Sequence, residues 1–245
     1  MPSAREIALS LASICTPVPP AGDGVCDRCH RPPSSGYSRC YSCSQVEQQL
    51  SAPCPLVVPI SLTEVLGQLH YQLRNYKGAE SQMQRDFLIR TAAILGYFLH
   101  QHADCIAEAA GGGWDVITSV PSSTERAGEH PLMRAIRAVG NLREQYEPLL
   151  RRGETQTGHN TASDVGFVPL RELGGERVLL IDDTFTSGAR AQSAASALSL
   201  AGASVAAIVP IGRVISPEFN ETTAAYWKRQ SALEFDFDVC CLCAE

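Results

Sequence analysis

The sequence lacks any apolar run that approaches the about 20 residues needed to cross a bilayer. It also lacks an excess of positive charge, because 20 Lys and Arg face 26 Asp and Glu and give a formal net charge of −6. This balance gives no indication of general electrostatic attraction to nucleic acid. Nucleic acid remains a weakly supported partner, because a small basic face could form from Arg28, Arg31 and Arg39. We therefore expect a soluble protein with no membrane partner.

The N-terminal residues lack the features of a secretory signal. The apolar stretch from Ile7 to Cys15 is short, and Glu6 stands where a signal peptide carries positive charge. Ser3 is instead well placed to cap a short helix. We expect a cytoplasmic protein, and in that reducing compartment paired cysteines indicate metal or redox chemistry more than disulfides.

Composition divides the chain of 245 residues into three parts. Residues 1–21 indicate a short helix and a Pro-rich linker. Residues 22–55 are rich in Cys, Gly, Pro and Ser and have little apolar periodicity, so this small module needs a crosslink, such as a bound metal or a disulfide, to fold. Residues 56–245 alternate between helical and strand patterns, which is typical of an α/β domain.

The periodicity of this last part predicts a doubly wound, mainly parallel sheet. Strand, helix and strand in succession imply a right-handed crossover, and fully apolar strands suit a sheet covered on both faces. The expected helices span residues 61–74, 79–109, 131–146 and 188–201. The expected strands lie within residues 114–121, 177–182 and 201–213. The polar stretch 151–166 is expected to be a mobile loop.

The module contains two Cys-x-x-Cys pairs, in which Cys26 and Cys29 are followed, after ten residues, by Cys40 and Cys43. Each pair directs two sulfurs at one point, and two pairs complete the tetrahedron that Zn²⁺ prefers. A four-thiolate site has no open position, so we expect a structural zinc. Two disulfides or a redox pair are the alternatives. His30 is expected to be a spectator or a hydrogen-bond donor.

The C-terminal tail carries three more cysteines, Cys240, Cys241 and Cys243. They could add or exchange ligands if the tail folds back on the module. They could equally be ordinary thiols of a buried terminal segment. Cys105 is expected to be a core residue.

The stretch "RVLLIDDTFTSGAR" (177–190) predicts a buried strand that ends in two acids, a turn of small residues, and a helix. Such a turn presents backbone N–H groups to an anion, with help from the helix dipole. The Walker A and Rossmann patterns are both missing. The predicted phosphate cradle consists of Thr184, Phe185, Thr186, Ser187 and Gly188. Asp182 and Asp183 would accept hydrogen bonds from ribose hydroxyls, so the implied ligand is a 5-phosphorylated ribose; an Asp cap on the helix is the alternative.

The segment "VLLIDDTFTSG" (178–188) resembles the ribose-5-phosphate loop of type I phosphoribosyltransferases. The resemblance implies binding of phosphoribosyl diphosphate with Mg²⁺. The segment "ITSVPSSTERAG" (117–128) is similar to the diphosphate loop of that family, in which Ser122, Ser123 and Thr124 would bind diphosphate and Arg126 would neutralise the leaving group. Residues 151–166 stand where the family carries a loop that closes over the site.

The zinc module, the Tyr76-Lys77-Gly78 turn and this domain together resemble the ComF-like group, which is associated with DNA uptake in competent bacteria. The chain departs from that group in having "ERAGEHPL" after the diphosphate loop, where Arg-Gly-Phe-Asn-Gln is usual. It also has Arg190 where a small Thr is usual.

The resemblance implies transfer of ribose-5-phosphate to an unidentified acceptor with release of diphosphate. Asp182 and Asp183 would stabilise positive charge on the ribose, and Arg126 would assist the leaving group. Thr186 stands where the 6-oxopurine enzymes of the family carry Asp, which disfavours hypoxanthine and guanine as acceptors. The alternatives are a non-catalytic phosphoribosyl diphosphate-binding regulator or DNA-uptake accessory, and a zinc-dependent nucleic-acid adaptor. A homodimer is compatible with the sequence.

Overall fold

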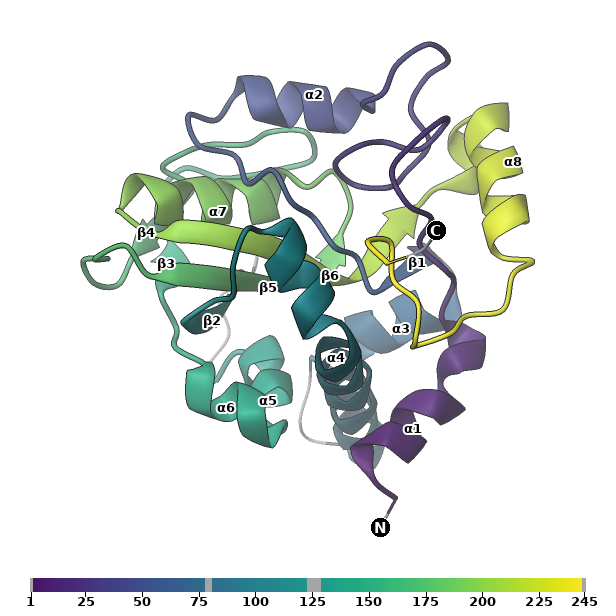
Figure 1. The fold of residues 1–245 in the computed structure, drawn as a ribbon, viewed down its shortest axis with the longest axis horizontal. Helices are drawn as coiled ribbons and strands as arrows, with labels where there is room; N and C mark the ends of the chain where they lie inside the picture. Colours follow the sequence, from purple (N-terminus) through teal and green to yellow (C-terminus); the bar gives the residue numbers. More distant parts are fainter. Residues whose placement is uncertain (1, 78–80, 123–128, 244–245) are drawn as a thin grey trace.

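Four parallel strands form the central sheet, in the order β1–β6–β5–β2 (Figure 1). The computed structural model describes residues 2–77, 81–122 and 129–243. The strands are β1 (Ser61–Glu64), β2 (Val116–Ser119), β5 (Arg177–Phe185) and β6 (Ser204–Ile215), and a separate antiparallel pair consists of β3 (Leu150–Arg152) and β4 (Phe167–Pro169). The expected α/β class with a mainly parallel sheet is confirmed.

Helices lie on both faces of this sheet (Figure 1). Alternate residues of β5 enter different cores, as side chains of a strand must. Leu179 and Ile181 pack with Ile94 of the long helix, whereas Val178 and Leu180 pack with Leu198 on the other face. The first face carries α1 (Ala4–Ser10), α3 (Gln68–Asn75), α4 (Gln82–Ala109), α5 (Pro131–Arg137) and α6 (Gly140–Gln145), and the second carries α2 (Tyr41–Gln48) and α7 (Ala189–Leu200).

The remaining elements are the short 3-10 helices η1 (Ala12–Ile14) and η2 (Pro217–Phe219) and helix α8 (Glu221–Gln230). Local signals account for several helix starts. Ser3 and Glu6 form a capping box at α1, and Ser81 and Gln84 form another at α4. The long helix expected over 79–109 and the helix expected over 188–201 are both confirmed.

Two expected helices are partly wrong. Residues 61–64 form the edge strand β1, which pairs with residues 212–215 of β6, and the helix starts only after Gly67. The helix expected over 131–146 is broken between α5 and α6 at residues 138–139. Val139 packs directly on Gly96 of α4, where a Cβ would meet the valine side chain at 2.9 Å. Packing against distant elements overrides local propensity at both places.

The cysteine-rich segment 22–55 packs on the rest of the chain. Helix α2 contacts α7, and all four cysteines of the two pairs share an apolar cluster with Leu180 and Phe185 of β5. In the part of the chain that the structure describes, no helix is both long and apolar enough to cross a membrane.

Candidate functional site

The turn after β5 lies at the edge of the sheet where the parallel strands β2 and β5 both end. Gly188 adopts a φ of 84°, and an added Cβ would lie 2.3 Å from the Phe185 ring, so both the backbone conformation and the packing require glycine. Gly188 is the N-cap residue of α7 and has no side chain that could accept hydrogen bonds from the first N–H groups of the helix. The N–H of Ala189 makes a long hydrogen bond of 3.4 Å to Ser187 Oγ, and the other N–H groups in the first turn of this 12-residue helix remain available to an anion.

The two acids of the motif point to opposite sides of the sheet, because β5 continues through both of them. Asp183 is directed at the end of α3, where its Oδ2 accepts a hydrogen bond of 2.9 Å from the Tyr76 hydroxyl and lies 2.7 Å from Lys77 Nζ. Burial opposes the charge of Asp183, but Lys77 and Tyr76 outweigh it and hold the pKa of this carboxyl below its ordinary value.

Asp182 faces the cleft in front of the turn. This cleft has a volume of about 300 Å³ and is also lined by Thr184, Thr186, Ser187 and His159. Burial, and then the neighbouring charge of Asp183, raise the pKa of Asp182 to about 7. The sequence places these acids side by side, whereas the structure gives them different partners and different proton affinities.

Arg190, in the first turn of α7, connects the turn after β5 with the segment that follows β2. Its guanidinium donates a hydrogen bond to the carbonyl of Pro121, just beyond β2. Ser122 follows as a partly buried residue, while Ser123, Thr124 and Arg126 lie outside the described residues. Arg190 and Arg152 also line a neighbouring pocket of about 160 Å³, so this end of the cleft is positively charged.

The stretch 151–166, expected to be a mobile loop, is held against the turn and the module in this structure. The backbone N–H of Asn160 donates to Ser187 Oγ at 3.1 Å, and the N–H of Ser163 donates to Ser193 Oγ at 2.9 Å. Asp164 accepts hydrogen bonds from the hydroxyls of Ser51 and Ser196. The loop therefore covers one side of the cleft in a docked conformation.

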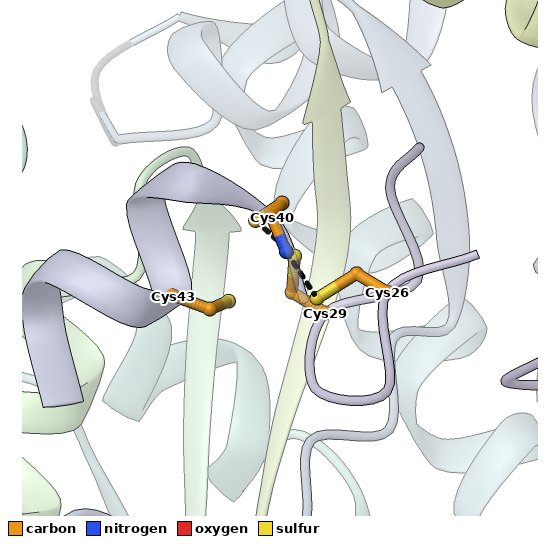
Figure 2. A group of neighbouring side chains, drawn as sticks. All are labelled: Cys26, Cys29, Cys40 and Cys43. Carbon is orange, nitrogen blue, oxygen red and sulfur yellow. Dashed lines mark hydrogen bonds between the residues drawn. The ribbon is translucent and has the colours of Figure 1, made fainter. Parts of the chain in front are cut away.

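The four cysteines of the module converge, as their spacing predicts (Figure 2). Their sulfurs are buried and lie within 4.8 Å of one another. Cys29 and Cys40 are 3.7 Å apart at Sγ, close to the about 3.8 Å that separates two thiolates on a tetrahedral zinc. All ten cysteines are free thiols in the structure. The donor set and its geometry fit the expected structural zinc.

The sequence motifs did not indicate Arg213, a fully buried arginine on β6 next to the candidate site. Its guanidinium donates to Cys29 Sγ at 3.1 Å and to the carbonyls of Phe185 and Thr186 at 3.0 and 2.6 Å. Four thiolates around one Zn²⁺ carry net negative charge, which balances a buried guanidinium. Arg213 therefore ties the four-cysteine cluster to the turn. A lone arginine inside the apolar run "AAIVPIGRVI" is the signal that could have identified it.

His30 behaves as a spectator, because its ring nitrogens lie 2.9 and 3.2 Å from the carbonyls of Pro19 and Val57, and the neutral ring can donate to only one of them. The small basic face of the module is largely neutralised. Arg28 pairs with Glu47, and Arg39 pairs with both Asp27 and Glu47. The tail cysteines do not join the module, since Cys240 and Cys243 lie beside His102 and Cys105 instead.

Comparison of the chain with protein-family models, with curated proteins and with solved structures found no match. The function is therefore inferred from the motifs and from the geometry of the site.

Proposed function

We propose that this protein binds phosphoribosyl diphosphate with Mg²⁺ at the turn after β5 and transfers its ribose-5-phosphate to an acceptor. In this proposal it is a phosphoribosyltransferase of type I character, similar to the ComF-like group. One observation carries the proposal. An acid-ended parallel strand runs through a glycine-dependent turn into the N-terminus of α7, and the whole motif opens on a cleft of about 300 Å³.

The turn is suited to the 5-phosphate group. The N–H groups at the start of α7 and the positive end of its dipole favour a dianion, and Ser187 and Thr186 bring hydroxyl groups to the same cleft. Asp182 lies at the other end of this cleft, where it would accept hydrogen bonds from the ribose hydroxyls. Arg190 and Arg152 supply positive charge nearby for the diphosphate.

Displacement of diphosphate at ribose C1 builds positive charge on the sugar and negative charge on the leaving group. The carboxylate of Asp182, which lines the cleft, would stabilise the first, and cationic side chains the second. Asp183, predicted for the same task, points to the other side of β5 and would act only through its field. Magnesium bound to the diphosphate oxygens would supply further neutralisation of the leaving group. Arg126, proposed for the same task, lies outside the described residues.

A pocket on the other side of Thr186 offers space for an acceptor. It has a volume of about 380 Å³ and lies between the module, the loop at His159 and Asn160, and the start of α8. The Arg31 guanidinium lies 5.7 Å from the centre of the Phe219 ring at this pocket, so a flat or aromatic group would find a stacking surface there.

A second candidate is a regulator that binds phosphoribosyl diphosphate without turnover. The ion pair between Lys77 and Asp183 favours it, because this pair removes part of the negative field that would stabilise a cationic ribose. A regulator of this kind needs only the phosphate turn and Asp182.

Calorimetry with phosphoribosyl diphosphate and Mg²⁺ tests binding. We expect the wild type to bind and Asp182→Asn to bind at least tenfold more weakly. The matched control is Asp104→Asn, which removes the same charge from an exposed position on α4. Absence of binding by the wild type rejects both candidates.

Release of diphosphate in the presence of a panel of bases and amines separates the two candidates. Turnover that depends on one acceptor supports the transferase. Tight binding with no diphosphate release from any acceptor supports the regulator.

A further inference from the structure

A second group of metal-ligating side chains lies where the C-terminal tail crosses helix α4. The group consists of His102 and Cys105 on the helix and Cys240 and Cys243 in the tail. Their ligand atoms lie within 4.8 Å of one another. We propose that these four side chains bind a structural Zn²⁺ ion in a Cys₃His site that fastens the tail to α4.

The backbone brings each pair of ligands to one point. His102 and Cys105 are three residues apart on α4, so they share one face of the helix. Cys240 and Cys243 have the Cys-x-x-Cys spacing, and a hydrogen bond of 3.2 Å from the N–H of Cys243 to the carbonyl of Cys240 closes their turn. One helical pair and one turn pair are a common way to assemble four zinc ligands.

The distances between the ligand atoms suit a tetrahedral ion. His102 Nδ1 lies 3.8 Å from Cys105 Sγ and 3.7 Å from Cys243 Sγ. Ordinary zinc bond lengths place a nitrogen and a sulfur ligand about 3.6 Å apart and two sulfurs about 3.8 Å apart. The Cys240 and Cys243 sulfurs are 3.3 Å apart, which a bound ion would widen slightly.

The orientation of His102 is the strongest single observation. Its Nε2 lies 2.8 Å from the carbonyl of Phe237, and a carbonyl can only accept a hydrogen bond. In the neutral ring Nε2 therefore carries the proton, and the lone pair of Nδ1 faces the thiols. A backbone carbonyl that holds the far nitrogen of a ligand histidine is the usual arrangement at zinc sites.

Backbone amides also prepare the tail sulfurs for a cation. The N–H of Cys240 donates to Cys243 Sγ at 3.1 Å, and the N–H of Leu242 donates to Cys240 Sγ at 3.4 Å. A similar bond of 3.3 Å runs from the N–H of Cys40 to Cys26 Sγ in the module. Such N–H···S bonds stabilise thiolate charge, which is the form that binds zinc.

The bound ion would hold the C-terminal tail against α4. Residues 231–243 contain no helix or strand, yet Phe237 is buried, with its ring 5.3 Å from that of Tyr97 on α4. A metal shared by α4 and the tail would hold this irregular segment in place. Cys243 is exposed, so the ion can enter from solvent.

Metal analysis of the full chain tests the site. We expect two zinc ions per chain in the wild type and one in the double variant Cys240→Ser/Cys243→Ser. The matched control is Cys241→Ser, which alters a buried thiol of the same segment outside the ligand set and should keep two. A wild type with one zinc, or a double variant with two, overturns the proposal, as does a wild-type disulfide between Cys240 and Cys243.

Two further measurements keep the test sharp if the double variant folds poorly. The single variant Cys243→Ser changes an exposed side chain and should lose the second zinc with the fold intact. Hydrogen exchange should then rise at least tenfold in residues 231–243 and stay unchanged in β5. Unchanged exchange in the tail after zinc loss would overturn the fastening role.

Discussion

Arg213 illustrates how one side chain links the four-cysteine cluster to the candidate site. A guanidinium buried without a counter-charge is strongly destabilising, so its position beside Cys29 Sγ indicates that the cluster carries negative charge. The same side chain holds the carbonyls of Phe185 and Thr186, which lead into the turn after β5.

Replacing Arg213 with Met should therefore destabilise the protein by about 3 to 5 kcal/mol, because a buried charge centre loses its partner. Urea unfolding and the rate of zinc release measure the effect, and both should change. Arg229→Met, an exposed arginine on α8, is the control and should be nearly neutral. Equal stability and zinc retention in Arg213→Met would contradict the charge balance.

Gly188→Ala tests the phosphate turn. The added Cβ would meet the Phe185 ring at 2.3 Å, and the left-handed conformation costs a further about 1 kcal/mol or more. We expect lower stability together with loss of phosphoribosyl diphosphate binding, measured by unfolding and calorimetry. Gly174→Ala, where an added Cβ meets no atom within 4 Å, should leave both unchanged. Normal binding by Gly188→Ala would argue against the turn as the phosphate site.

Asp182 should make stability fall as the pH rises from about 4 to about 7. Its pKa is about 7 in the folded chain against 3.8 when unperturbed, so the folded state binds the extra proton in this window. The slope contributed is at most about 1.4 kcal/mol per pH unit. Asp183 acts in the opposite sense, because its pKa is lowered, and only below this window.

Urea unfolding at a series of pH values, on wild type and Asp182→Asn, measures this contribution. The variant should have the flatter profile and be the more stable protein at pH 8, while Asp104→Asn should follow the wild type. Parallel profiles for wild type and Asp182→Asn would show that Asp182 keeps an ordinary pKa.

At the scale of elements, the docked segment 158–164 depends on Asp164, which bonds to Ser51 of the module and Ser196 of α7. Asp164→Ala should free this segment, because a lost hydrogen bond to a charged group costs about 1.5 to 3 kcal/mol. Hydrogen exchange should rise in residues 158–166 while β5 stays protected. Glu154→Gln, an exposed acid of the same loop, is the control. Unchanged exchange in Asp164→Ala would place the anchor of the loop elsewhere.

At the scale of the whole molecule, the zinc module and the phosphate turn should respond together to metal removal. Chelation should weaken binding of phosphoribosyl diphosphate at least tenfold, and added zinc should restore it, because Arg213 loses its counter-charge when the metal leaves. Calorimetry before and after chelation measures this. The variant Cys243→Ser separates the two metal sites, since it should bind normally until the module itself is stripped. Full affinity in the zinc-free chain would contradict the coupling.

Local patterns predicted the elements that carry their own signals. Helix α4 has a capping box and an apolar repeat, and the succession of β5, turn and α7 follows from apolar residues, glycine and alanine. β1 escaped prediction because its four residues become a strand only by pairing with β6. The break at Val139 likewise depends on the close approach of α4 at Gly96.

Some features of the candidate site likewise follow from local spacing, and others depend on the fold. Spacing alone predicted the module ligands, whereas the role of the three tail cysteines stayed open between extra ligands and buried thiols. The partners of the tail cysteines were not predicted, because His102 lies 141 positions before Cys243. The turn at Tyr76 and Lys77 belongs to the pattern that resembles the ComF-like group, but its contact with Asp183 depends on the fold.

The sequence by itself therefore determined which short segments present ligands: two cysteine pairs that each direct their sulfurs at one point, and a strand whose acids precede a glycine turn. Such features depend on residues within one turn of backbone. Tertiary structure alone decided that Asp182 and Asp183 point to opposite sides of β5, that Arg213 bridges the module and the turn, and that the tail cysteines lie beside α4. These outcomes depend on burial and on charge pairing between segments far apart in the chain, which no local spacing encodes.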